Sequence, residues 1–280
     1  MKFFFNFFIL FLFFLSITYA QELVLKEIQI RPGQVELIKF FISNGLQVKN
    51  YSCAKAKLPF EQKGNVFQSF VMASYFMKPG KFVCEIELAA DNKIERKEIL
   101  SVSIVPYQYK KETLKVAPKT INLSKKDLAR YEKERKILDS IYGHFSSVVY
   151  FEDKFLKPSD LPISSVYGTK RVFNNVKSTQ HLGTDFRAPM GTPVLASNKG
   201  KVVLAEDLFF SGNTILIDHG LSLFTMYAHL SKIDCKVGDV VEKGALIGHS
   251  GNTGRVSGPH LHWGVKVNGS WVDGFTLPLN

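Results

Sequence analysis

Short runs of hydrophobic residues, many alternating with polar ones, follow one another along most of the chain, which is typical of β-strands. In the first third, these runs are rich in β-branched and aromatic residues and are separated by turn signals such as RPG, SNG and KPG. The runs occupy residues 23–30, 37–43, 65–74, 81–88 and 99–105. We therefore predict a small β-sandwich over residues 21–105. It has no cluster of His, Asp and Glu, so we expect a targeting, packing or covering role for it.

The last part of the chain shows the same kind of pattern with more glycine. Short apolar runs separated by Gly-containing turns predict an all-β domain over residues 166–280, and no pattern at helical period is long enough to compete. These runs lie at residues 191–197, 201–207, 214–220, 223–230, 239–250 and 259–267. The predicted fold class is therefore mainly β, with an antiparallel sheet in the C-terminal domain.

Residues 106–165 differ from both β regions, because they are rich in lysine and mixed charge. The run SKKDLARYEKERKILDSIYG predicts one amphipathic helix in this connector, and its apolar face should dock against a domain. Ser124 and Asp127 have the spacing of an N-terminal capping box, and Gly143 is a suitable stop. Apolar residues recur at helical spacing at Leu128, Tyr131, Leu138 and Ile141.

Residues 1–20 have the features of a secretory signal: Met-Lys, an apolar stretch, and the small-residue exit SITYA. The apolar stretch is shorter than the ~20 residues of a spanning helix, so we expect cleavage after Ala20 and no membrane span in the mature chain. A retained membrane anchor is the alternative. The formal net charge is +11, but the basic residues form no arm or stripe, which argues against a nucleic-acid binder. The charge fits work near an anionic polymer or membrane surface.

The three cysteines allow one disulfide and one free thiol in an exported protein. Cys53 and Cys84 lie in the same predicted sandwich, whereas Cys235 lies far along the chain between alternating apolar residues. We predict a Cys53–Cys84 bridge and a buried, free Cys235. No C-x-x-C spacing supports a thiolate zinc site or a thioredoxin-type redox motif.

Six of the seven histidines lie between residues 181 and 262. In the run PHLHWGV, His260 and His262 would project to the same face of a strand and share one cavity. His181 and Asp185 in HLGTD lie at a predicted bend, where they can converge on one ion. Three N/O ligands with an open fourth position are typical of catalytic zinc, so His181, Asp185 and one member of the HLH pair fit such a site. The other member and His229 remain as candidates for proton transfer.

HLGTD, YAHL and GNTGRVSGPHLHW resemble the signatures of the lysostaphin-type, LytM-like zinc metallopeptidases. The resemblance covers roughly residues 165–275, and GTDFRAPMGTPV and KVGDVVEKGALIG match between the motifs. It implies a single zinc ion and a division of roles among the candidates. His181, Asp185 and His262 would be the zinc ligands, His229 and His260 the catalytic pair, His219 and His249 structural or supporting residues, and His144 incidental.

This resemblance implies hydrolysis of peptidoglycan stem peptides. The order of signal, β-rich region, charged helix and terminal catalytic domain is similar to periplasmic enzymes of Gram-negative bacteria, for which the D-alanyl to meso-diaminopimelate cross-link is the expected bond. Oligoglycine bridges and trimming of uncross-linked stems stay open. Two other hypotheses are a non-catalytic LytM-like regulator that activates a cell-wall amidase, and a wall-binding module that uses the N-terminal sandwich. We also expect that the N-terminal region or the connector could inhibit the enzyme intramolecularly.

Overall fold

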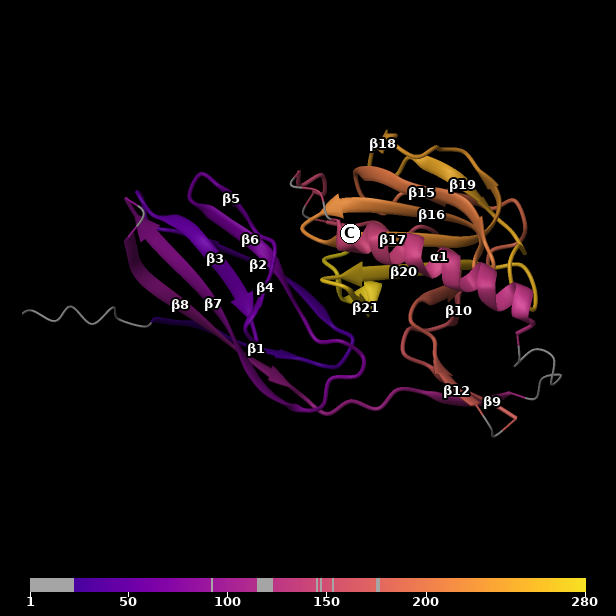
Figure 1. The fold of residues 1–280 in the computed structure, drawn as a ribbon, viewed down its shortest axis with the longest axis horizontal. Helices are drawn as coiled ribbons and strands as arrows, with labels where there is room; N and C mark the ends of the chain where they lie inside the picture. Colours follow the sequence, from indigo (N-terminus) through magenta and orange to yellow (C-terminus); the bar gives the residue numbers. More distant parts are fainter. Residues whose placement is uncertain are drawn as a thin grey trace, which may run out of the picture.

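The computed structural model describes residues 23–91, 93–114, 123–144, 146, 148–152, 154–174 and 177–280. Its described part is mainly β, as the sequence predicts, and contains four sheets and one α-helix. The N-terminal strands form one body and the C-terminal strands another, and the two bodies lie end to end (Figure 1). The predicted signal sequence at residues 1–20 lies outside the described residues.

The N-terminal body is a sandwich of two sheets. One sheet has the order β1-β8-β7-β3-β4 and the other the order β2-β6-β5. Alternate residues of the two sheets point inward and form a shared core that includes Tyr51, Phe67 and Ile86. The strands are β1 (Leu23–Ile30), β2 (Val35–Phe41), β3 (Gln47–Cys53), β4 (Ala56–Lys57), β5 (Glu61–Lys63), β6 (Val66–Met72), β7 (Gly80–Ala90) and β8 (Lys93–Ile104).

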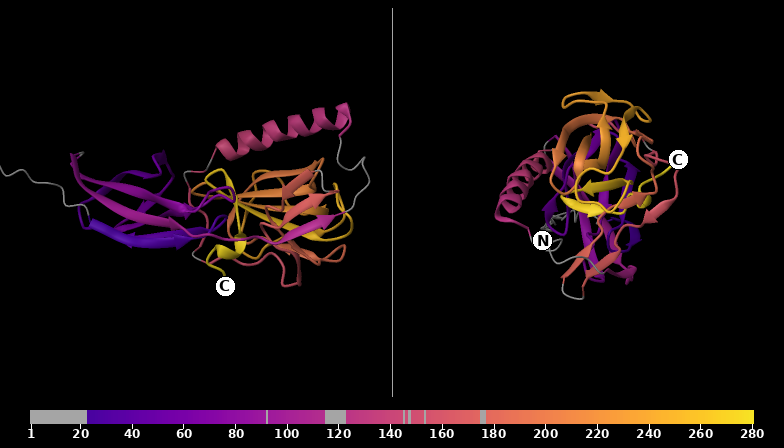
Figure 2. Two further views of the ribbon diagram at one scale, coloured as in Figure 1. Left: turned by 90° about the horizontal axis from the view of Figure 1, so that it is seen from below. Right: turned by 90° about the vertical axis from the view of Figure 1, so that its right-hand side faces the viewer.

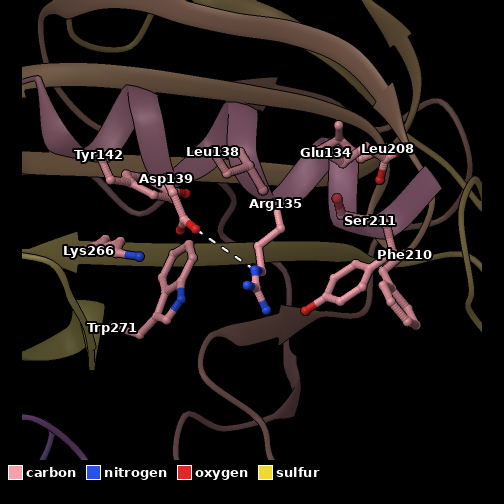
Figure 3. Close-up of a pocket in the computed structure, with 11 residues that line it drawn as sticks. Glu134, Arg135, Leu138, Asp139, Tyr142, Leu208, Phe210, Ser211, Lys266 and Trp271 are labelled. Carbon is pink, nitrogen blue, oxygen red and sulfur yellow. Dashed lines mark ion pairs between the residues drawn. The ribbon is translucent and has the colours of Figure 1, made fainter. Parts of the chain in front are cut away.

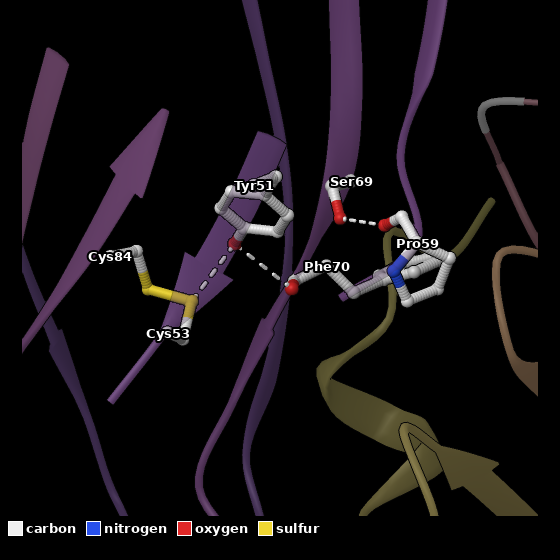
Figure 4. The surroundings of a disulfide bond; sticks show 6 residues. All are labelled: Tyr51, Cys53, Pro59, Ser69, Phe70 and Cys84. Atoms are coloured by element: carbon white, nitrogen blue, oxygen red, sulfur yellow. Dashed lines mark hydrogen bonds between the residues drawn. A yellow bond between two sulfur atoms is a disulfide. The ribbon is translucent and has the colours of Figure 1, made fainter. Parts of the chain in front are cut away.

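A disulfide joins Cys53 to Cys84 across the neighbouring strands β3 and β7, where the two residues are register partners (Figure 4). The predicted pairing is therefore confirmed. The hydroxyl of Tyr51 lies 3.1 Å from Cys53 Sγ and 3.3 Å from the carbonyl oxygen of Phe70 in the facing sheet. Cys235 is free, as predicted, but half-buried rather than buried. Burial and the nearby carboxylates of Asp239 and Asp234 raise the pKa of its thiol to about 11.

The C-terminal body is built on a ten-stranded sheet whose main path is β10-β13-β20-β17-β16-β15-β18, with β14, β19 and β21 paired at its side. One face of this sheet covers the larger core, which includes Ile215, Tyr227 and Trp263. Its strands are β10 (Ile163–Ser165), β13 (Thr184–Phe186), β14 (Pro193–Leu195), β15 (Gly200–Leu208), β16 (Gly212–Gly220), β17 (Leu223–Ile233), β18 (Val240–Val241), β19 (Leu246–Ser250), β20 (Leu261–Val267) and β21 (Ser270–Val272).

The predicted amphipathic helix is confirmed as α1 (Lys125–Gly143), which begins where the Ser124 side chain accepts a hydrogen bond from the backbone N–H of Asp127. Gly143 is the last helical residue instead of the residue beyond the end, and His144 caps the helix in an extended conformation. The helix lies along one side of the C-terminal sheet (Figure 2). Leu138, Ile141 and Tyr142 pack there against apolar residues of β15, β16 and β17.

The connector also contributes a strand and a packed segment to the C-terminal body. Strand β9 (Lys111–Leu114) pairs in parallel with β11 (Lys170–Phe173), which pairs in turn with β12 (Lys177–Gln180). Phe151 and Phe155 insert into the larger core. Much of the region predicted to be a connector is therefore packed against the C-terminal sheet.

A polar and aromatic interface joins the two bodies. Arg31 forms an ion pair with Asp273 at 2.6 Å, and its guanidinium lies 4.4 Å from the centroid of the Tyr107 ring. The backbone N–H of Asp273 donates to the carbonyl of Gly33, just before the short 3₁₀ helix η2 (Gly274–Thr276).

No helix in the part of the chain that the structure describes is long and apolar enough to cross a membrane.

Candidate metal centre

The register of two antiparallel strands brings the most distant candidate residues together. Asp185 on β13 lies directly opposite His262 on β20. His181 lies just after the end of β12 and four residues before Asp185, so the bend between β12 and β13 turns its ring back toward the carboxylate. The bend that HLGTD predicts is therefore present.

Three side-chain atoms converge at this point. His181 Nε2 lies 2.9 Å from Asp185 Oδ1 and 3.2 Å from His262 Nδ1, and His262 Nδ1 lies 2.8 Å from Asp185 Oδ1. Ligand atoms at zinc-ligand distances in a tetrahedral site would lie about 3.3 Å apart. The three observed distances are therefore close to the spacing that a small tetrahedral cation requires. They are shorter than that spacing by a few tenths of an ångström or less.

Neighbouring groups orient the His181 ring. Its Nδ1 lies 3.2 Å from the carbonyl oxygen of Val166 and 3.2 Å from Ser165 Oγ. Because a carbonyl oxygen only accepts, Nδ1 is the protonated nitrogen in that contact, and Nε2 keeps its lone pair for the centre. His181 and Asp185 are both buried, with 7% of each residue exposed.

Arg171 supports the same centre from the neighbouring three-stranded sheet. Its Nη2 donates to Asp185 Oδ2 at 3.2 Å and to Ser165 Oγ at 2.9 Å. One guanidinium therefore holds the second oxygen of Asp185 and the hydroxyl that contacts His181. Sequence reasoning missed Arg171, because β11 lies in a separate sheet and no local motif marks it.

The electrostatics of the centre favour an ionised Asp185 carboxylate and a neutral His262 imidazole. Burial alone would raise the pKa of Asp185, but its contacts with the His181 and His262 rings hold the pKa well below its ordinary value. Burial lowers the pKa of His262, against the attraction of Asp185. A neutral imidazole and an ionised carboxylate are the protonation states in which these groups bind a metal.

Gly183 lets the backbone pass close to the centre. A Cβ atom at this position would lie 2.4 Å from His262 Cε1 and 2.5 Å from His262 Nε2. Any side chain at residue 183 would therefore displace the His262 ring. The close approach of the His262 ring therefore requires glycine at position 183.

His229 and His260 lie beside the three converging groups. Their ring centroids are 4.7 Å apart, and His260 Nε2 is 3.8 Å from Asp185 Oδ1. His229 Nδ1 contacts the carbonyl of Thr253 at 3.0 Å, and His260 Nδ1 contacts the carbonyl of Gly258 at 2.9 Å. Both Nδ1 atoms therefore carry hydrogen in these contacts, which leaves each Nε2 with a lone pair.

A backbone irregularity places His229. Between Tyr227 and Leu230, strand β17 has one residue more than its partner β16, and His229 has a φ of 63°. Such a bulge re-aims a side chain, and a left-handed conformation at a non-glycine residue costs of order 1–3 kcal/mol. Burial and the neighbouring rings of His262 and His260 lower the pKa of His229 to about 3.

A shallow cleft of about 400 Å³ opens beside His260. It is lined by Ser164, Arg187, Pro189, Pro259 and His260. His260 therefore faces a cleft that is open to solvent, and an exposed cation, Arg187, borders the same cleft.

The remaining histidines lie in other contacts. His219 is fully buried, with Nδ1 2.7 Å from the carbonyl of Lys199 and Nε2 2.7 Å from Thr225 Oγ1. His249 Nδ1 lies 2.9 Å from Asp234 Oδ2, and His144 caps α1. None of these three joins the converging groups, which the structure limits to His181, Asp185 and His262 among the described residues.

Comparisons with known proteins agree with the motifs. Residues 179–274 match peptidase family M23. The peptidoglycan DD-endopeptidase ShyA of Vibrio cholerae is 47% identical over 112 residues, which are 40% of this chain and 26% of that protein. The chain thus matches about a quarter of the length of that relative.

Two solved structures extend the comparison. A crystal structure from Pseudomonas aeruginosa assigned to peptidase M23 is 28% identical, with a TM-score of 0.63, over 89% of this chain and 96% of that one. The catalytic domain of the antimicrobial peptidase lysostaphin from Staphylococcus simulans is 34% identical, with a TM-score of 0.38, over 41% of this chain and 90% of that one. The resemblance indicated by the motifs is confirmed for this part of the chain: residues 179–274 match peptidase family M23.

Proposed function

We propose that the protein is an exported, zinc-dependent endopeptidase that cuts peptide cross-links of peptidoglycan. The observation that carries the proposal is the convergence of His181 Nε2, Asp185 Oδ1 and His262 Nδ1 within hydrogen-bonding distance of one another. Two further imidazoles with available Nε2 atoms lie beside them. The relative ShyA, named a peptidoglycan DD-endopeptidase, supports the choice of substrate.

The donor set fits zinc. Two imidazole nitrogens and one carboxylate oxygen suit this borderline ion, and three protein ligands leave a position open for water or substrate, as in catalytic sites. His181, Asp185 and His262 would hold the ion. When bound, zinc polarises a carbonyl group and lowers the pKa of water toward 7. The support of Asp185 by Arg171 and of His181 by the Val166 carbonyl would keep both ligands oriented.

His229 and His260 would handle protons during peptide hydrolysis. Each is fixed through Nδ1 to a backbone carbonyl, so each can accept a proton at Nε2 without turning its ring. The low pKa of His229 keeps it neutral at physiological pH. An imidazolium formed at either position would stabilise negative charge on the substrate oxygen or return the proton to the leaving amine.

The bond that we propose is the D-alanyl to meso-diaminopimelate cross-link in the periplasm. The name of ShyA supports a D,D-bond, and the signal-like first 20 residues support export. Oligoglycine bridges and uncross-linked stems are the alternative substrates. Regulation of an amidase without catalysis, wall binding through the sandwich, and intramolecular inhibition by residues 21–165 stay predictions.

A digest of purified muropeptides would test this function. The protein should convert tetrapeptide-cross-linked dimers into monomers, and the masses of the two products locate the bond that was hydrolysed. Replacing His229 or His260 with Ala should abolish turnover while zinc stays bound, whereas Asp185→Ala should lose zinc. Equal zinc loss in all three variants would refute the division of roles, and intact dimers with zinc bound to the wild type would refute the proposed bond.

A further inference from the structure

Helix α1 lies on the face of the C-terminal sheet that carries the metal centre. Along β20, Leu261, Trp263 and Val265 point into the larger core, so His262 and Lys266 point to the opposite face. Trp271 contacts Gly264 on that face, and it belongs to the cluster on which α1 packs. The helix and the candidate ligand His262 therefore share one surface.

A pocket of about 210 Å³ lies beside this contact and is lined by residues of both the helix and the C-terminal body (Figure 3). Its aromatic walls come from Tyr131, Tyr142, Phe210 and Trp271. Four charged residues border it: Glu134, Arg135, Asp139 and Lys266. The size is that of one amino-acid side chain with its polar end group.

Three of these four charges are available to a ligand. Glu134 is already engaged, because it accepts from Arg130 and from the backbone N–H of Phe209. Among the described residues, Asp139 forms an ion pair only with Arg135, at a long distance of 3.8 Å, and both side chains are more than 60% exposed. Lys266 is half-buried, and none of its described neighbours forms an ion pair with it within 4.0 Å.

Aromatic rings surround the Lys266 ammonium. Its Nζ lies 3.9 Å from the centroid of the Tyr142 ring and 5.1 Å from that of Trp271. Burial lowers the pKa of Lys266, and Asp139 opposes this effect. The hydroxyl of Tyr142 is buried and has no hydrogen-bond partner among the described residues. A carboxylate that entered the pocket would offset the loss of water around Lys266.

The pocket lies at a defined distance from the metal centre. Lys266 follows His262 by four residues on one strand, which places their backbones about 14 Å apart at ~3.4 Å per residue. In the proposed substrate, the donor stem carries a meso-diaminopimelate just before its terminal D-alanine. The side chain of that residue ends in an ammonium and a carboxylate on one carbon, roughly 12 Å from the scissile carbonyl when extended.

We propose that this pocket binds the zwitterionic end of the donor stem's diaminopimelate, with Lys266 contacting its carboxylate, Asp139 contacting its ammonium and Trp271 packing against its methylene groups. The inference rests on the proposed function. It adds a specificity site, formed jointly by α1 and the sheet, to the centre that carries out hydrolysis.

Fluorescence of Trp271 reports on the pocket directly, since the other tryptophan, Trp263, is buried in the core. The purified protein would be titrated with L-alanyl-γ-D-glutamyl-meso-diaminopimelate, and with the same tripeptide amidated and acetylated at the side-chain end. We expect a saturable change with the zwitterionic probe and binding at least tenfold weaker with the neutral one. Equal binding of both probes would overturn the inference.

Single substitutions distinguish a loss of binding in the pocket from a loss of binding caused by unfolding. Lys266→Met keeps the apolar stem and should weaken binding of the zwitterionic probe about tenfold, as should the exposed Asp139→Asn. The exposed Lys236→Met removes the same charge elsewhere and should bind like the wild type. Zwitterion-selective binding unchanged in both pocket variants would overturn the inference.

The cleavage assay distinguishes this inference from the proposed function. In dimers with a zwitterionic donor side chain, Lys266→Met should raise KM about tenfold and leave kcat nearly unchanged, with no effect on dimers neutralised at that end. Normal cleavage without a response of Trp271 would refute the pocket and leave the proposed function standing. Selective binding without cleavage of any dimer by the wild type would refute the proposed function and leave a zwitterion-binding pocket.

Discussion

Arg171→Met should weaken zinc binding without unfolding the protein. The guanidinium donates to Asp185 Oδ2 and to Ser165 Oγ, so its removal leaves one oxygen of a buried carboxylate without its cationic partner. A hydrogen bond to a charged group contributes about 1.5–3 kcal/mol. Because 27% of the Arg171 side chain is exposed, water replaces part of that contribution. We therefore expect a loss of zinc affinity of roughly 10- to 30-fold, within the range for residues that orient metal ligands.

The assay is competition for zinc between the protein and a chromophoric chelator at constant pH. Lys170→Met is the matched control, because it removes a positive charge from the adjacent, exposed position of the same strand. At saturating zinc, Arg171→Met should regain most of the wild-type kcat/KM, since His229 and His260, which we propose to handle protons, are unchanged. Equal zinc affinities of the two variants would refute the role assigned to Arg171.

Three further predictions concern the ligand geometry, the sandwich and a buried imidazole. Gly183→Ala should lower zinc affinity in the same competition assay, because its Cβ would lie 2.4 Å from the His262 ring, and an unchanged affinity would contradict that crowding. Replacing Cys53 and Cys84 with Ser should lower the free energy of unfolding in urea by about 3–4 kcal/mol, the chain-entropy value for the loop of 31 residues, and an unchanged value would contradict it. Burial lowers the pKa of His219 from 6.5 to about 4. The fold therefore has its full stability above pH 6.5, where the imidazole is neutral in both the folded and the unfolded chain. Between pH 6.5 and 4 only the unfolded chain takes up the proton, so about 3 kcal/mol of stability is lost as the pH falls through 4. His219→Asn should flatten the dependence of stability on pH in that interval, and equal slopes for both proteins would refute the assignment.

The parts of the centre that the sequence predicts are those with local signals. The i, i+2 spacing of His260 and His262 places both rings beside Asp185, because successive residues of an extended chain alternate between faces. The bend at HLGTD follows from Gly183. The residues alone left open which member of the HLH pair lies closer to Asp185, since that depends on the register between β13 and β20.

Features set by long-range pairing escaped prediction. Arg171 reaches Asp185 only because β11 lies between β9 and β12 in a separate sheet. The positive φ of His229 arises from a bulge against β16, and nothing in YAHL marks it. Phe151 belongs to a charged region of the sequence but is buried in the larger core. Charge and hydropathy averaged over a segment do not reveal such single buried residues.

The helix shows the same division between local and tertiary information. Its existence follows from the cap at Ser124 and from apolar residues at helical spacing. Its position on the sheet face that carries His262 depends on where Tyr142 finds apolar partners, and only the folded C-terminal body provides these. The pocket beside Lys266 is a consequence of that position.

The most direct measurement of the central claim is hydrolysis of purified cross-linked muropeptide dimers by one protein sample in three states: as purified, after removal of metal with a chelator, and after addition of one equivalent of zinc. The account predicts cleavage in the first state, none in the second, and recovery in the third with one zinc bound per chain. Cleavage that persists after complete metal removal would contradict the account. So would a His262→Ala variant that, with zinc added, cleaves the dimers as fast as the wild type.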